Sequence, residues 1–232
     1  MPLRYIYFDL DNTLLDHNKA ESKSHQAVYD SFPVLRQVPL DEWLETYQEI
    51  NHNLWVQYQD GEIDRHQLHF SRFHDSMIEM GLSTVKSHEI GVTYMEKYRE
   101  YWDWVDQAEE TLALTSRHFN VGIITNGFKE TQLKKFEKLS MHKYTRQMVI
   151  SEELGVLKPD PKVFDYATEL AGVPREDILY VGDSYSSDVV GGLNAGWQTA
   201  WYTGVAGEEE AELTPHLTFS DFSDLKKYLK IG

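Results

Sequence analysis

The stretch YIYFDLDNTLLD, residues 5–16, joins an apolar run to a group of acidic residues. Residues 5–8 are aromatic or β-branched, as is typical of a buried strand. Asp9, Asp11 and Asp16 follow at once. Like charges at the end of a buried strand repel one another, so this arrangement is costly unless a positive group lies among them. The stretch therefore predicts a strand that ends at a charged site.

Short apolar runs alternate with amphipathic helical patterns from about residue 107 onward. The runs are VGIIT (121–125), QMVI (147–150), ILYVG (178–182), TAWY (199–202) and LTFS (217–220). This alternation predicts a parallel sheet with helices on both faces, and residues 5–8 have the same character as these runs. One connecting helix is clearly marked, because Asp160 suits its N-cap and Pro161 its first position. The expected fold class is α/β.

The intervening segment has helical spacing of its apolar residues instead. The spaced residues are Trp43, Tyr47, Ile50, Leu54; Phe70, Phe73, Met77, Met80; and Ile90, Tyr94, Tyr98, Tyr101. Asp60-Gly61 and Gly81 suit a turn and a helix end between these patterns. We expect a helical cap domain at 17–101, inserted into a core formed by 1–16 plus 102–232.

Composition excludes several classes of function. The chain of 232 residues has 22 lysines and arginines against 38 acidic residues, a net charge of -16. This balance opposes binding to nucleic acid polymers and to anionic membranes. The chain has no cysteine, which excludes disulfides and thiolate chemistry. We find no stretch apolar enough to span a membrane, and we expect a cytoplasmic protein, either a monomer or a weak homodimer.

Polar residues follow four of the predicted strands. The positions are Asp9 and Asp11; Thr125, Asn126 and Gly127; Lys158; and Asp183 with Asp188. Taken singly, an aspartate before a helix is usually an N-cap, and Asn-Gly is usually a turn. Ligands of open parallel sheets bind beyond the carboxyl ends of the strands, so we expect these residues to converge there. A cluster of carboxylates in a partly buried cleft predicts a divalent cation, and oxygen ligands favour Mg²⁺.

The other residues of this set suit a phosphoryl group. Lys158 supplies a cation for its oxygens, while the Thr125 hydroxyl and the backbone N–H groups around Asn126 and Gly127 supply hydrogen-bond donors. An aspartate is able to act as the nucleophile through an acyl phosphate. The residues therefore predict a small phosphorylated metabolite as the substrate.

The motifs together resemble those of the haloacid dehalogenase superfamily. DLDNT is similar to its DxDx(T) signature, and IITNG, Lys158 in LKPDP, and GDSYSSD are similar to its second, third and fourth motifs, in the same order. The resemblance covers essentially the whole chain. It implies a Rossmann-like parallel-sheet core with an inserted helical cap of the C1 type.

The resemblance also implies roles for the acidic residues. Asp9 would be the nucleophile and a magnesium ligand. Asp11 would protonate the leaving oxygen and then activate water, and its main-chain carbonyl would bind the metal. Asp183 would bind magnesium directly, with Asp188 acting through a water or as an anchor for the site.

The remaining motif residues would bind the phosphoryl group. By the same resemblance Thr125 and Asn126 would hold it, and Lys158 would bind it and orient Asp9.

Related chemistries are less well matched. A 2-haloacid dehalogenase releases halide, which needs no proton, and its motif commonly lacks an acid at the position of Asp11. A phosphonatase would use a lysine of the cap, and none of Lys19, Lys23, Lys86 and Lys97 stands in a context that suggests it.

Two further alternatives keep part of this chemistry. A phosphomutase would use the same core but depend on a bisphosphate. A phospho-accepting signalling domain also combines acids, a threonine and a lysine, but its acidic pair lies well before the accepting aspartate and it needs no helical insertion. A Ser-His-Asp hydrolase is matched less well still, because no G-x-S-x-G occurs.

The cap is expected to choose the substrate. Its rings include His52, Trp55, Tyr58, Phe70, Phe73 and His74. Such rings usually form the core of a helix bundle, but one or two of them could stack on a base. NHNLWVQYQDGEID (51–64) and the flanks of the motifs resemble the cytosolic pyrimidine 5′-nucleotidase branch of the superfamily. This similarity implies hydrolysis of nucleoside monophosphates, while pyrophosphate and sugar phosphates stay open as substrates.

Overall fold

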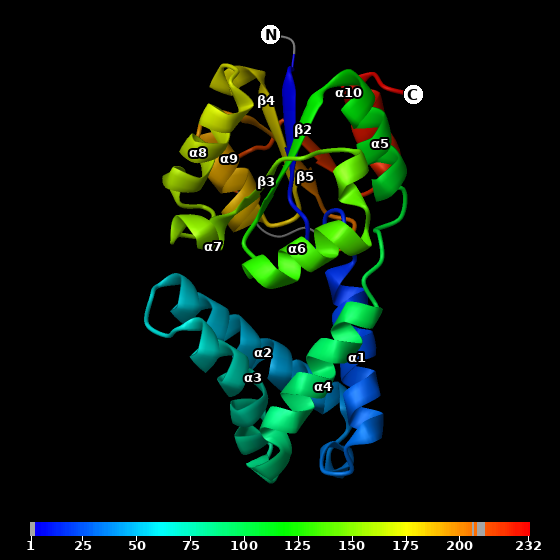
Figure 1. Ribbon diagram of the computed structural model, residues 1–232, viewed down its shortest axis with the longest axis vertical. Helices are drawn as coiled ribbons and strands as arrows, with labels where there is room; N and C mark the ends of the chain where they lie inside the picture. The colour runs from blue at the N-terminus through cyan, green and yellow to red at the C-terminus, as the bar shows by residue number, and fades with distance from the viewer. Residues whose placement is uncertain (1–2, 206, 208–211) are drawn as a thin grey trace. The chain divides into compact units, whose positions relative to one another are not determined.

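The computed structural model describes residues 3–205, 207 and 212–232. The chain divides into two compact units, one formed by residues 1–17 and 103–232 and the other by residues 18–102 (Figure 1). These limits lie one residue from the boundaries given by the sequence pattern. That the second unit acts as a substrate cap stays a prediction.

The first unit is built on a six-stranded parallel sheet. Its strands are β1 (Tyr5–Phe8), β2 (Asn120–Thr125), β3 (Met148–Ile150), β4 (Ile178–Gly182), β5 (Gln198–Tyr202) and β6 (Leu217–Phe219). Their order is β3-β2-β1-β4-β5-β6, so the chain moves outward on one side of β1 and then crosses to the other side. Every predicted strand is present, and the predicted α/β fold class is confirmed.

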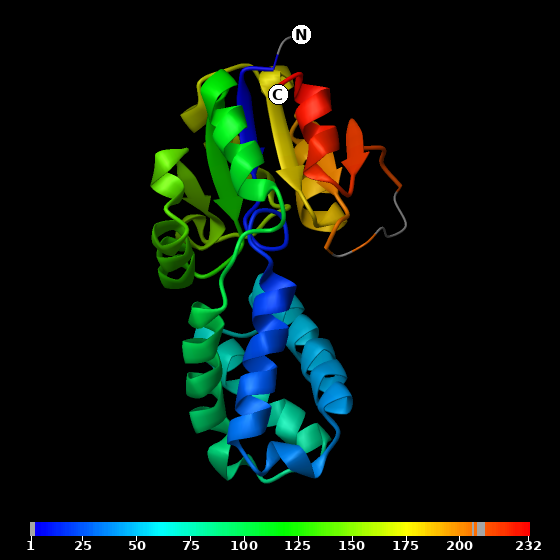
Figure 2. The same ribbon diagram turned by 90° about the vertical axis from the view of Figure 1, so that its right-hand side faces the viewer.

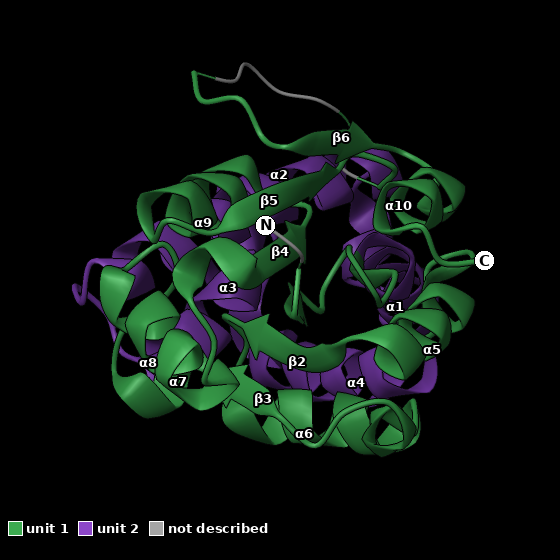
Figure 3. Cartoon of the chain, turned by 90° about the horizontal axis from the view of Figure 1, so that it is seen from above, with its two compact units in different colours: residues 1–17, 103–232 green, residues 18–102 purple. Residues whose placement is uncertain are grey.

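Helices cover both faces of this sheet (Figure 3). One face carries α7 (Ser151–Leu154), α8 (Pro161–Ala171) and α9 (Val190–Asn194), and the other carries α5 (Ala108–His118) and α10 (Phe222–Leu229). Helix α6 (Lys129–Lys138) follows β2. The predicted start of α8 is correct, because the Asp160 side chain accepts a hydrogen bond from the backbone N–H of Lys162 and Pro161 is the first helical residue.

The core beneath α8 explains why β1 is apolar along its whole length. All residues of β1 are buried, since β1 lies between β2 and β4 and both of its faces are covered. Tyr7 stacks on Trp197 with ring centroids 5.4 Å apart, and its hydroxyl donates to the carbonyl of Ala167 in α8. A buried central strand leaves its carboxyl end as the place where polar residues begin.

The second unit contains four long helices (Figure 2). They are α1 (His17–Ser31), α2 (Leu40–Gln59), α3 (Arg65–Glu79) and α4 (Ser87–Glu100). Asp60 caps α2, and Gly61 and Gly81 have φ angles of 73° and 66°, so the predicted breaks are correct. Asp64 and Gln67 form a capping box at the start of α3.

The centre of this bundle is aromatic and polar together. His25 of α1 packs against Trp43 and Tyr47 of α2, Phe73 of α3 and Tyr94 of α4. The Trp43 indole N–H donates to Nδ1 of His25 at 3.2 Å, while Nε2 of His25 is buried without a partner among the described residues. A single imidazole therefore joins all four helices.

Phe70 is not part of the core, although the helical spacing groups it with Phe73 and Met77. Phe70 is 50% exposed and stacks on His74, because the buried face of α3 is formed by other residues. These are Leu68, Arg72, Phe73, Ser76 and Met77. The spacing from Phe73 and Met77 was correct, but the face continues through two polar residues that a hydrophobic pattern does not include.

Among the described residues, no helix combines the length and the apolar composition needed to cross a membrane.

Protonation of His25 is expected to make folding sensitive to acid. Burial, followed by the charge of Arg72, lowers the pKa of His25 to about 3. In the unfolded chain the imidazole titrates at a pKa of about 6.5, so below that pH the unfolded state binds more protons and stability falls as the pH falls. Between pH 6.5 and about pH 3, the contribution of His25 to the free energy of unfolding should fall by about 1.4 kcal/mol for each unit by which the pH falls.

Replacing His25 with Asn isolates this contribution, because the amide can still accept from Trp43 but does not titrate. Urea unfolding at pH 7.5 and pH 5.5 should show a smaller loss of stability for His25→Asn than for the wild type. The exposed His88 gives a matched control in His88→Asn. An equal loss in wild type and His25→Asn would contradict the assignment.

Candidate active site

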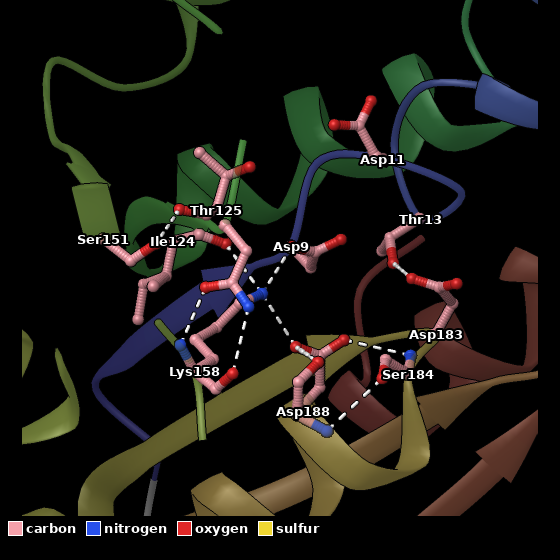
Figure 4. A network of polar contacts seen from close by, with 12 residues as sticks. Asp9, Asp11, Thr13, Ile124, Thr125, Ser151, Lys158, Asp183, Ser184 and Asp188 are labelled. Atoms are coloured by element: carbon pink, nitrogen blue, oxygen red, sulfur yellow. Dashed lines mark hydrogen bonds and ion pairs between the residues drawn. The ribbon is translucent and has the colours of Figure 1, made fainter. Parts of the chain in front are cut away.

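Polar side chains gather where β1, β2 and β4 end (Figure 4). Asp9 follows β1, Thr125 ends β2, and Asp183 follows β4. Because β2 and β4 flank β1, these three carboxyl ends lie at one edge of the sheet. The sheet thus brings together residues that are more than a hundred positions apart in the sequence.

Asp9 and Lys158 form a buried ion pair at the centre of this edge. Nζ of Lys158 lies 2.6 Å from Oδ1 of Asp9, and the two side chains are 2% and 9% exposed. The backbone N–H of Asp9 donates to the carbonyl of Val181 in β4, which fixes the residue to the sheet. The second carboxylate oxygen of Asp9 accepts no hydrogen bond from the described part of the chain.

The ammonium of Lys158 has further acceptors that hold it in place. It donates to Oδ1 of Asp188 at 2.8 Å and to the hydroxyl of Tyr180 at 2.7 Å, and it lies 3.3 Å from the carbonyl of Ile124. The neighbouring carboxylates Asp188 and Asp9 raise the pKa of Lys158, although burial opposes them. Burial alone would lower the pKa of Lys158, so the two carboxylates are what favours its charged form.

The side chain of Asn126 secures the backbone of Lys158. Its amide nitrogen donates to the carbonyl of Lys158 at 3.0 Å, and its amide oxygen accepts from the Lys158 N–H at 2.8 Å. The predicted contact of Asn126 with a phosphoryl group stays a prediction. The observed role is to tie the loop of Lys158 to the end of β2.

Asp188 reaches the site through a short π-helix, Tyr185–Val189. Its carboxylate accepts from the backbone N–H of Ser184 at 3.0 Å as well as from Lys158. A Cβ atom on Gly182 would lie 2.3 Å from Oδ2 of Asp188, so a side chain at position 182 would displace this carboxylate. Glycine at the end of β4 is thus required for the close approach.

Asp183 completes a cluster of three carboxylates. One oxygen each from Asp9, Asp183 and Asp188 lie within 4.8 Å of one another, and Thr13 donates to Oδ1 of Asp183 at 3.2 Å. Burial, together with the neighbouring carboxylates, raises the pKa values of Asp9 and Asp183, although Lys158 opposes the shift. With all three carboxylates ionised, the single ammonium of Lys158 would leave two negative charges uncompensated, which equals the charge of one divalent cation; the raised pKa values express this repulsion.

The side chain of Asp11 lies outside this cluster, and the predicted binding of the metal by the Asp11 main-chain carbonyl stays a prediction. The Asp11 carboxylate pairs with Lys135 of α6 at 2.5 Å and accepts from the amide of Gln132 at 2.9 Å. Burial would raise the pKa of Asp11, but the charges of Lys135 and His17 and these hydrogen bonds lower it. Asp11 is therefore held as an anion at the edge of the site.

Thr125 and Gly127 form a tight turn after β2. The Thr125 hydroxyl accepts from the Gly127 N–H at 3.3 Å, and the Thr125 carbonyl accepts from the hydroxyl of Ser151. The predicted binding of a phosphoryl group by Thr125 and Gly127 stays a prediction. Both residues do lie at the carboxyl end of β2, next to the ion pair of Asp9 and Lys158.

Several residues of this site were not foreseen from the sequence. Tyr180 lies inside an apolar strand pattern, and Lys135 and Gln132 lie on a helix of low hydrophobicity that resembles a solvated one. Thr13 and Ser184 stand inside the quoted motifs DLDNT and GDSYSSD, so the motifs themselves marked these two positions.

The haloacid dehalogenase-like hydrolase family matches residues 6–202, from β1 to the end of β5, which includes all the residues described above. The chain belongs to this family. The predictions of the superfamily, of its Rossmann-like fold and of a hydrolase are confirmed.

Similar proteins within the family include phosphatases of two substrate types. The chain is 35% identical to pyrimidine 5′-nucleotidase YjjG of Escherichia coli over 97% of both chains. It is 30% identical to the glyceraldehyde 3-phosphate phosphatase of Pyrococcus furiosus over 86% of this chain and 80% of that protein. Its fold matches the crystal structure of the putative HAD-hydrolase YfnB of Bacillus subtilis bound to magnesium, with a TM-score of 0.86, 25% identity and full coverage of both chains.

The hydrogen bonds of Asn126 are expected to stabilise the fold as well as the site. Asn126→Ala removes two bonds to the backbone of Lys158 and should lower the free energy of unfolding by about 1–2 kcal/mol. Urea unfolding at neutral pH measures this change. Asn194→Ala, at an exposed position, is the matched control. A change no larger than that of the control would contradict the role given to Asn126.

Proposed function

We propose that the protein is a magnesium-dependent phosphatase that hydrolyses nucleoside 5′-monophosphates, pyrimidine nucleotides in particular, through an aspartyl-phosphate intermediate. The observation that carries this proposal is the ion pair of Asp9 and Lys158 at the carboxyl end of β1. It holds one oxygen of Asp9 at 2.6 Å from a buried ammonium and leaves the other oxygen for attack.

The residues at the end of the sheet fit a magnesium ion. Magnesium prefers oxygen ligands and typically takes one or two carboxylates together with waters and substrate oxygens. The oxygens of Asp9, Asp183 and Asp188 are close enough to share one ion, and when ionised the three groups would carry two negative charges more than Lys158 neutralises. Asp9 and Asp183 would hold the ion, with Asp188 bound to Lys158 beside them. When bound, the ion would neutralise charge on the phosphoryl oxygens.

The first step is attack by Asp9 on the phosphorus of the ester. Oδ2 of Asp9 forms the new P–O bond in line with the leaving oxygen, whose bond to phosphorus breaks. Lys158 stands 2.6 Å from Oδ1 and is placed to stabilise the charge of the transferring group. Most of the rate enhancement comes from positioning and from compensation of charge.

Asp11 supplies acid and base catalysis in this scheme. The Asp11 carboxylate, an anion in the free protein, first takes up a proton from solvent; the carboxyl group then gives this proton to the leaving oxygen, so that the nucleoside departs as an alcohol. It then takes a proton from the water that attacks the phosphoaspartate, which returns Asp9 and releases phosphate. An acid at this position favours ester hydrolysis over the release of halide, which requires no proton.

The preference for a nucleotide is supported by the similarity to YjjG and by aromatic residues of the second unit. Phe73 is buried in the bundle and is not available to a ligand, whereas Phe70 is 50% exposed. Trp55 and Tyr58 form an edge-to-face pair with centroids 5.7 Å apart. Aromatic rings of this kind are able to stack on a base.

A sugar phosphate is the second candidate substrate. The similarity to the glyceraldehyde 3-phosphate phosphatase of Pyrococcus furiosus favours it, and in the proposed scheme the residues at the end of the sheet would contact only the phosphoryl group of either substrate. The choice between the two substrates therefore depends on the second unit rather than on the residues of the sheet.

Phosphate release across a substrate panel tests the proposed function. The panel contains UMP, dTMP, AMP, glyceraldehyde 3-phosphate, glucose 6-phosphate and pyrophosphate, each with magnesium and with a chelator. We expect turnover only with magnesium, and the highest kcat/KM with a pyrimidine monophosphate. A higher value for a sugar phosphate or for pyrophosphate would contradict the nucleotide preference and keep the core chemistry.

Asp9→Asn is expected to lose turnover on every active substrate of this panel, because the amide is not a nucleophile. Circular dichroism should show that the variant keeps its fold. Asp16→Asn changes a nearby acid outside the carboxylate cluster and serves as the control. Activity of Asp9→Asn close to that of the wild type would overturn the mechanism.

A further inference from the structure

Helix α6 presents an unusual buried face. Only two of its residues are buried, and both are polar: Gln132 at 1% exposure and Lys135 at 2%. A helix at the surface of a sheet normally buries an apolar stripe, and lysine is almost never fully buried unless it is paired. Apolar packing therefore does not explain why this polar face of α6 is buried.

Both buried side chains donate hydrogen bonds to the carboxylate of Asp11. Lys135 Nζ lies 2.5 Å from Oδ1 of Asp11, and Gln132 Nε2 donates to Oδ2 at 2.9 Å. Gln132 and Lys135 are three positions apart, so they lie on one side of the helix and reach Asp11 together. Each oxygen of Asp11 thus has its own donor, which fixes both the position and the rotation of the carboxyl group.

Gly127 makes room for this arrangement. A Cβ atom at position 127 would lie 1.5 Å from Nε2 of Gln132, so any side chain there would displace the amide. The φ angle of Gly127 is not in the left-handed region, so space rather than backbone conformation requires glycine here. The turn after β2 and the face of α6 are therefore matched to each other and to Asp11.

These contacts are poorly explained as a device for stability. A buried ion pair adds little net stability, because the cost of removing two charges from water offsets their attraction. Oε1 of Gln132 is in addition buried without a partner among the described residues, which is a further cost. Costs of this kind are typical of sites where geometry serves a reaction.

We propose that Lys135 and Gln132 are positioning residues that hold the carboxyl group of Asp11 where it exchanges protons with the leaving oxygen and with water. The same contacts hold the carboxylate of Asp11 apart from the cluster of Asp9, Asp183 and Asp188. Within that cluster the charge of Asp11 would add to the repulsion. The inference rests on the acid and base role proposed for Asp11.

The test compares two aromatic phosphate esters that differ in their need for a proton. Phenyl phosphate has a poor leaving group that requires protonation, whereas 2,4-dinitrophenyl phosphate has a good one that does not. Because kcat/KM reports the steps up to the first irreversible one, it isolates the transfer to Asp9. Lys135→Met should lower kcat/KM for phenyl phosphate by at least about tenfold and change that for the dinitrophenyl ester by less than about threefold.

A double-mutant cycle shows whether Lys135 acts through Asp11. In an Asp11→Asn background the additional change Lys135→Met should have no further effect on phenyl phosphate. Lys134→Met alters the neighbouring, exposed lysine of the same helix and should leave both esters unaffected. Equal losses for both esters, a gain on either ester, or the same loss with and without Asp11 would overturn the inference.

Gln132→Met provides a second route to the same answer if Lys135→Met does not fold. It should show the same selective loss for phenyl phosphate, and an equal change for both esters would overturn the inference. The same measurements distinguish a failure of the proposed acid and base role of Asp11 from a failure of the positioning role. If Asp11→Asn itself treats the two esters alike, the role of Asp11 is wrong, whereas selectivity in Asp11→Asn but not in Lys135→Met or Gln132→Met rejects only the positioning role.

Discussion

The buried ammonium of Lys158 is the interaction on which the site depends. It forms ion pairs with Asp9 after β1 and with Asp188 beyond β4, and it donates to the hydroxyl of Tyr180. The side chain of Asn126 is hydrogen-bonded to the backbone of Lys158. A charge that is 2% exposed is tolerated only with such partners. The parallel sheet provides them, because neighbouring strands deliver their polar ends to one edge.

The charged groups at this edge form two sets, which differ in whether positive charge matches negative charge. Asp9, Asp183 and Asp188 outnumber Lys158 and leave room for a divalent cation, whereas Asp11 forms a balanced pair with Lys135. The unbalanced group suits the binding of metal and phosphoryl oxygens. The balanced group suits a carboxyl group that must stay in place and exchange protons. One strand end thus serves both tasks, although its two acids are only two residues apart.

Much of this arrangement is visible in the sequence. The apolar run of β1 followed by Asp9, and the same pattern at Asp183, indicated a parallel sheet with acids at its carboxyl edge, and the fold confirms the sheet. The sequence did not reveal Tyr180 and Lys135 as site residues, because Tyr180 lies in an ordinary strand pattern and Lys135 in a helix pattern typical of a solvent-exposed helix. Only tertiary contacts reveal that their polar atoms face the site. The spacing that includes Phe70 did not reveal the buried face of α3 for a similar reason, since Arg72 and Ser76 continue that face.

The central claim is that Asp9 carries the phosphoryl group during turnover, and acid quenching tests it most directly. The wild-type protein is mixed with magnesium and the best substrate of the panel, quenched in acid within the first turnover, digested and analysed by mass spectrometry. We predict one added phosphoryl group on the peptide that contains Asp9, and its removal by hydroxylamine, as expected of an acyl phosphate. Phosphate release without a modified peptide, or with the phosphoryl group on another residue, would contradict the account.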